Sequence, residues 1–123
     1  MTDPRTDVTE ARRLAALWSG LLLAPAAFLA NLEIGYALVP VACRHGSSLP
    51  VHLVHAASLL LALGGAFVAY RARPTGGPPW PDDEGGREAR TRFLAGLGVM
   101  TSLFFGLVIL SQSVPGFVLS SCQ

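Results

Sequence analysis

The segment Cys43–His55, with the sequence CRHGSSLPVHLVH, separates two long apolar stretches of this 123-residue chain. It contains one of the two cysteines, all three histidines and a single arginine, Arg44. Apolar residues continue from both of its ends far enough to cross a lipid bilayer. The segment is therefore predicted to connect two membrane-spanning helices.

Three apolar runs reach the roughly 18 to 20 residues that a helix, rising about 1.5 Å per residue, needs to cross a bilayer core of about 30 Å. The composition agrees, because 51% of the residues are hydrophobic and only 14% are charged. We predict one all-α integral membrane domain with three spans. The expected segments are a tail 1–13, a span 14–42, an outer loop 43–50, a span 51–70, a Pro- and Gly-rich loop 71–92, a span 93–114 and a tail 115–123.

A cleaved signal peptide is the alternative interpretation of the first run, since Arg12 and Arg13 precede it and Ala24-Pro25-Ala26 resembles a cleavage site. Hydrophobicity continues well past Ala26, which favours a retained helix that Pro25 kinks.

Arginine positions predict the orientation. The N-terminal tail has three arginines and the Pro- and Gly-rich loop has five, whereas the loop between the first two spans has only Arg44. The positive-inside rule then places the N-terminus in the cytoplasm and the C-terminus in the periplasm of a bacterial inner membrane. The net charge of only +1 gives no indication of nucleic-acid binding.

Cys43 follows the first span and Cys122 follows the third, so this topology places both on the outer face. An oxidising periplasm favours a disulfide between them. The alternative is that the thiols bind a soft metal such as Cu(I), but the CxxC spacing typical of such sites is missing.

Histidines add a second candidate group. His52 and His55 lie about one turn apart on one helix face, and His45 lies two residues from Cys43. Imidazole binds copper, zinc and haem iron, so His45, His52 and His55 are candidate metal ligands. The simpler interpretation is that His45 and His52 are hydrated residues at the interface, and for His55 both interpretations stay open.

Glu33 is the most costly residue to place in lipid. It lies seven residues, or about 10 Å, below Pro40, where a carboxylate needs a partner, a wet cavity or a proton. A pair between Glu33 and His55 is expected from their similar depth. Other polar residues at that level could support it, namely Asn31, Tyr36, Ser58 and Gln112. Such a cluster suits a proton relay, a polar pocket, a structural clasp or the binding of a larger subunit, and these stay open.

Small residues recur at intervals of four on two spans and predict close helix packing. They are Ala62 with Ala66 and Gly65 with Ala69 on the second span, and Gly98, Ser102 and Gly106 on the third. The same faces could instead pack against a partner subunit.

No P-loop, GxGxxG, GxSxG, CxxCH or HExxH motif is found, so a free-standing enzyme is not expected. The segments GYALVPVAC, VHLVHAASLLLALGGAFVAYRAR and FLAGLGVMTSLFFGLVILSQSVPGFVLSSCQ resemble small three-helix bacterial inner-membrane proteins that are associated with haem-copper cytochrome c oxidases. The most specific features of the resemblance are YALVP-x-x-C and the terminal Cys-Gln.

This resemblance implies a respiratory-chain setting, in which the chain is a non-catalytic accessory subunit or assembly factor of a terminal oxidase and requires no cofactor. The alternative hypothesis is a protein that binds copper, haem or quinone through Glu33, His52 and His55. A transporter is less favoured, because three helices do not readily enclose a path.

Overall fold

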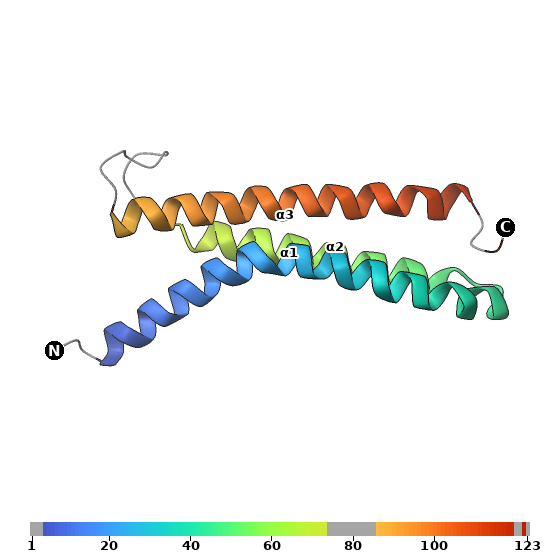
Figure 1. Ribbon diagram of the computed structural model, residues 1–123, viewed down its shortest axis with the longest axis horizontal. Helices are drawn as coiled ribbons and strands as arrows, with labels where there is room; N and C mark the ends of the chain where they lie inside the picture. Colours follow the sequence, from blue (N-terminus) through green and yellow to red (C-terminus); the bar gives the residue numbers. More distant parts are fainter. Residues whose placement is uncertain (1–3, 74–85, 120–121, 123) are drawn as a thin grey trace.

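The computed structural model of the protein describes residues 4–73, 86–119 and 122, which form three α-helices and no β-strand (Figure 1). These are α1 (Pro4–His45), α2 (Leu49–Arg71) and α3 (Arg87–Val118). Each helix contains a window that is long and apolar enough to cross a membrane. The prediction of three apolar helices is confirmed, while most of the predicted Pro- and Gly-rich loop (74–85) lies outside the described residues.

The helices extend beyond the predicted spans. Residues 4–13, predicted as a tail, belong to α1, whose 42 residues correspond to about 63 Å, twice a bilayer core. Pro4 suits a first helical position, and alanine, arginine and glutamate in the next turns favour helix. At the other end, α3 continues through Pro115 to Val118. Hydropathy marks the apolar part of a helix and does not detect polar turns that extend it.

The connection between α1 and α2 contains only three residues, 46–48. Gly46 adopts a φ of 64°, and the Ser47 amide donates to the carbonyl oxygen of Ala42 at 3.1 Å. This is the glycine-terminated helix end known as a Schellman motif. Pro50 then occupies the first turn of α2, where its missing N–H leaves no bond unmade. The chain therefore reverses abruptly, and Cys43 lies in the last turn of α1.

The bundle core consists of small residues. α2 runs antiparallel to α1 and α3 (Figure 1), and its Gly65 and Ala69 face the two other helices. A Cβ built on Gly20 of α1 would lie 2.7 Å from the Cβ of Ala69, and one built on Gly98 of α3 would lie 3.0 Å from it. Small residues thus allow the three backbones to approach closely. Of the predicted packing residues, Ala62, Gly98, Ser102 and Gly106 are buried and Ala66 is half-buried.

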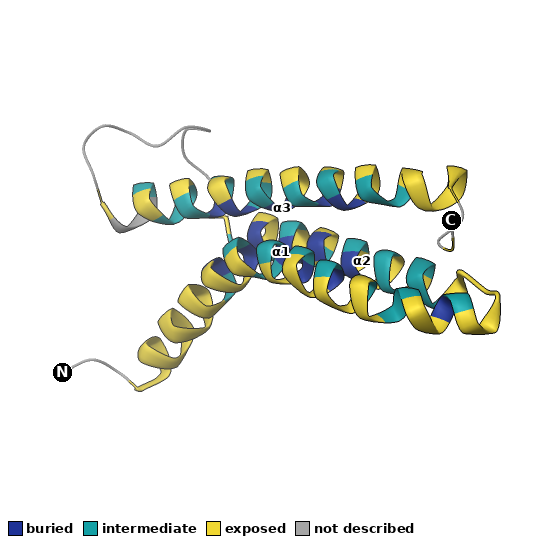
Figure 2. Ribbon diagram, turned by 45° about the vertical axis from the view of Figure 1, so that its right-hand side comes forward, coloured by how far each residue is buried: buried dark blue, intermediate teal, exposed yellow. Residues whose placement is uncertain are grey.

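Large apolar side chains cover the outside of the bundle. Figure 2 shows exposed residues recurring along all three helices. Leu60, Met100 and Leu107 are each more than 60% exposed, whereas Ile109 is the largest side chain that is fully buried. A water-soluble fold places such residues inside. Small residues inside and large apolar residues outside are the arrangement expected of a helix bundle in lipid.

The first turns of α1 diverge from the other helices (Figures 1 and 2). Every residue from 4 to 15 is exposed, and burial begins at Leu17. The bundle is consequently closed along most of its length and open at the end where α1 begins.

Candidate functional site

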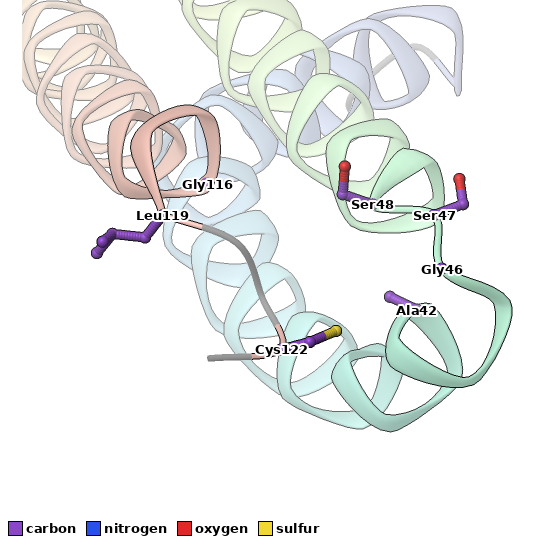
Figure 3. A pocket seen from close by; sticks show the side chains of 7 residues that line it. All are labelled: Ala42, Gly46, Ser47, Ser48, Gly116, Leu119 and Cys122. Atoms are coloured by element: carbon purple, nitrogen blue, oxygen red, sulfur yellow. The ribbon is translucent and has the colours of Figure 1, made fainter.

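The disulfide between Cys43 and Cys122 joins the end of α1 to the segment after α3. Their Cα atoms lie 5.6 Å apart, within the usual range for a disulfide. The predicted pairing is therefore present. A cavity of about 180 Å³ lies beside it, lined by Ala42, Gly46, Ser47, Ser48, Gly116, Leu119 and Cys122 (Figure 3). Among these described lining residues, the polar groups are two hydroxyls and backbone atoms, and none is a free titratable side chain.

Asn31 and Gln112 join α1 and α3 inside the bundle. The Asn31 Nδ2 donates to Gln112 Oε1 at 3.2 Å, and Asn31 is only 2% exposed. Its Oδ1 is buried and accepts no hydrogen bond from the described residues. A buried amide oxygen without a donor costs free energy. The contact between Asn31 and Gln112 therefore satisfies the Asn31 Nδ2 and leaves the Asn31 Oδ1 without a donor among the described residues.

His55 and Ser58 approach the same level from α2. His52 lies opposite Gly116 and Ala62 lies opposite Gly106, so the antiparallel register places His55 near the height of Gln112. The His55 Nδ1 lies 2.9 Å from the carbonyl oxygen of Val51, one turn earlier on its own helix. Because a carbonyl only accepts, Nδ1 carries the proton, and in neutral imidazole Nε2 remains an acceptor. Ser58 is buried.

Glu33 and Tyr36 lie on the exposed face of α1, away from the buried Asn31. Both side chains are exposed, and Tyr36 is 78% exposed. The expected contact between Glu33 and His55 is not formed. The contact was predicted because Glu33 and His55 lie at a similar depth along the helices. Each residue turns a helix by about 100°, so Glu33 is rotated about 200° from the buried Asn31 and points out of the bundle. The predicted cluster is thus divided into an inner group (Asn31, Ser58, Gln112, with half-buried His55) and an outer pair (Glu33, Tyr36).

The candidate metal ligands are also separated. The ring of His52 stacks on Phe117, with centroids 4.6 Å apart, and His45 is exposed at the end of α1. Cys43 is bonded to Cys122. Within residues 4–73, 86–119 and 122, no three His, Cys, Asp or Glu side chains are grouped so that they could hold a metal ion. The cysteine and the three histidines of residues 43–55 are thus close in the sequence, but their side chains do not form one group in the structure.

Four arginines at the other end of the molecule are among the residues that line a second, largely open cavity. Arg12 and Arg13 come from α1, Arg71 ends α2, and Arg73 follows it. The sequence shows these residues only as a count of positive charge at two span ends. Their proximity depends on the antiparallel packing of α1 and α2, which a charge count does not detect.

The fold and the sites define an all-helical three-helix chain with membrane-length helices, an exposed carboxylate in an apolar span and a disulfide at one end. No family model, no curated protein and no solved structure matches the sequence or the fold.

Proposed function

We propose that the protein is a multi-pass protein of a bacterial cytoplasmic membrane that docks laterally on a larger membrane protein through the face of α1 around Glu33. The single observation that carries this proposal is the exposure of Glu33 in an apolar span. On insertion scales an unpaired charge at the centre of a spanning helix costs about 2.5 to 3.5 kcal/mol, which is the upper value on those scales for Glu33 at about 10 Å below Pro40. A partner that covers the carboxylate removes much of this cost.

The surroundings of Glu33 favour a protein partner over lipid. Ala30 and Ala37 are exposed on the same face, one turn to either side, and small residues let a second helix approach closely. Tyr36 offers a hydroxyl one turn further out. Pro40 cannot donate to the carbonyl of Tyr36, so that oxygen is free to accept. The face therefore presents mainly acceptors, and its partner carries an arginine, lysine or other donor at that depth.

The partner we propose is a haem-copper terminal oxidase, for which this chain serves as a non-catalytic accessory subunit or assembly factor. The support for this partner is the resemblance of YALVP-x-x-C and of the third span to proteins associated with such oxidases. The alternative role, binding copper, haem or quinone, needs Glu33, His52 and His55 to share a site. The exposed Glu33 side chain, the His52 ring on Phe117 and the His55 ring beside the Val51 carbonyl do not share a site, which favours docking over ligand binding.

Cross-linking in cells tests the docking face. A photoreactive phenylalanine analogue at Tyr36 should yield one product with a larger membrane protein, whereas the same analogue at Leu60, exposed on α2, should not. Glu33→Ala should weaken the product more than Glu33→Gln, because the amide still offers an acceptor. Equal cross-linking at both positions, or none at Tyr36, would reject the docking face.

The identity of the partner is tested separately. Mass spectrometry of the cross-linked product should find an oxidase subunit, and the oxidase purified in mild detergent from cells without this protein should have reduced activity or metal content. A Glu33-dependent product with another membrane protein would reject the oxidase and keep the docking face.

A further inference from the structure

A largely open cavity of about 630 Å³ lies between the beginning of α1 and the end of α2, and its arginines are exposed. Its walls combine four arginines with apolar side chains. They are Arg12, Arg13, Ala16, Phe67, Val68, Arg71, Ala72 and Arg73. No carboxylate is among these lining residues. Four guanidinium groups that line one cavity, with no carboxylate among its described lining residues, create a positive potential that attracts an anion.

Aromatic rings hold two of these guanidinium groups in place. The Arg71 Cζ lies 5.1 Å from the centre of the Phe67 ring, and the Arg73 Cζ lies 4.2 Å from the centre of the Tyr70 ring. Stacking of this kind restricts the long side chains and leaves their N–H groups available for other partners. A planar guanidinium binds phosphate oxygens through two parallel hydrogen bonds. The cavity therefore offers pre-positioned donors for phosphate.

The cavity also lies where the apolar spans begin. Leu14 starts the apolar part of α1, and Arg71 ends that of α2. Exposed Trp18 and Tyr70 mark this level, as aromatic residues do at membrane interfaces. Lipid phosphates lie at this height, and the apolar walls formed by Ala16, Phe67 and Val68 suit the first part of an acyl chain. A free phosphate would use the arginines and leave this apolar wall uncovered.

We propose that this cavity binds the headgroup of an anionic phospholipid, such as phosphatidylglycerol. Basic pockets between helices on one side of a membrane are suited to such headgroups. α1 diverges from the other two helices toward its N-terminus (Figure 2), and the lipid is expected to enter the cavity from that side. The site is independent of the docking face around Glu33, which lies in the other half of α1.

The test uses the full chain purified in mild detergent with the disulfide intact. Native mass spectrometry measures the binding of phosphatidylglycerol and of phosphatidylcholine with the same acyl chains. The wild-type protein should bind phosphatidylglycerol and should not retain phosphatidylcholine. The double variant Arg12→Gln/Arg71→Gln should weaken binding about 25-fold, at about five-fold for each arginine.

The matched control is Arg44→Gln/Arg90→Gln, which removes the same charge outside the cavity and should change the affinity less than about two-fold. Equal weakening in both double variants, or weakening in neither, would overturn the proposal, as would equal binding of phosphatidylcholine. Inorganic phosphate is the second arm: displacement of the lipid by phosphate at comparable concentration would assign the site to a soluble anion instead.

Loss of structure is checked by helix content and by formation of the disulfide. If Arg12→Gln/Arg71→Gln fails this check, Arg13→Gln/Arg73→Gln changes two other lining residues. It should show the same 25-fold loss of lipid affinity, and wild-type affinity in this folded variant would reject the site.

Discussion

The Ser102 hydroxyl donates a hydrogen bond to the backbone carbonyl of Gly20, 3.0 Å away, and so joins α3 to α1 inside the bundle. Gly65 of α2 borders the same hydroxyl, since a Cβ there would lie 3.1 Å from Ser102 Oγ. All three helices therefore meet at one polar contact among small residues. Larger residues at either glycine would block access to the carbonyl.

Ser102→Ala should lower stability by about 0.6 kcal/mol and by no more than about 1.7 kcal/mol, the range measured for hydrogen bonds between membrane helices. Unfolding in mixed micelles, followed by circular dichroism with the disulfide intact, measures the change. Ser111→Ala is the control on the same helix, because Ser111 is exposed and bonds only to Leu107 one turn earlier. Equal losses in both variants would contradict the assigned contact.

Gly20→Ala should destabilise the bundle by about 1 to 3 kcal/mol, the usual cost of overpacking. The new methyl group would lie 2.7 Å from the Cβ of Ala69, and neither atom belongs to a flexible side chain. Gly35→Ala on the same helix meets nothing within 4 Å. This control should be neutral or gain up to about 1 kcal/mol from helix propensity. A neutral Gly20→Ala would mean that α1 and α2 are further apart than described.

Substitutions at Asn31 and Gln112 should be asymmetric. Gln112→Leu leaves both polar groups of buried Asn31 without partners, at a cost of about 1 to 3 kcal/mol. Asn31→Leu removes the unpaired oxygen together with the bond and leaves only half-buried Gln112 to find another partner, so it should cost less than about 1 kcal/mol. Unfolding of both single variants and the double variant provides a thermodynamic cycle. A costly Asn31→Leu beside a harmless Gln112→Leu would show that another donor satisfies Oδ1.

Cys43→Ser/Cys122→Ser should lower stability by less than about 4.5 kcal/mol, the value that the chain-entropy treatment gives for a loop of this size. The bond joins residues 79 positions apart. In the proposed membrane arrangement the helices stay inserted when they separate, and this already restricts the unfolded chain. Thermal unfolding of the double variant, compared with wild type in reductant and oxidant, measures the effect. Wild type in oxidant should be the most stable sample, while reduced wild type and the variant should agree.

The three helices and the disulfide were accessible from the sequence because both depend on one-dimensional properties. Apolar length indicates a span, and the number of spans between two cysteines decides whether they reach the same side. The small-residue interfaces were also accessible through their spacing. The acceptor for Ser102 was not, because a backbone carbonyl such as that of Gly20 has no sequence signature.

The direction in which each side chain points was harder to predict from the sequence. Depth along a span predicted a meeting of Glu33 and His55, but the rotation of α1 turns Glu33 to the outside and Asn31 to the inside. Hydropathy could not indicate this rotation, since both faces of the helix are largely apolar. The cavity lined by four arginines depends on how α1 diverges from α2, which is a property of the packed bundle.

The Cys43–Cys122 disulfide requires that an even number of membrane crossings separates the two cysteines, because both must lie on the same side of the bilayer. In the proposed membrane arrangement, α2 and α3 are the two crossings that separate the cysteines along the chain. If either helix alone fails to cross, Cys122 is left on the opposite side of the bilayer and the bond cannot form. Oxidation of this pair therefore distinguishes correctly threaded chains from those in which one helix has failed to cross.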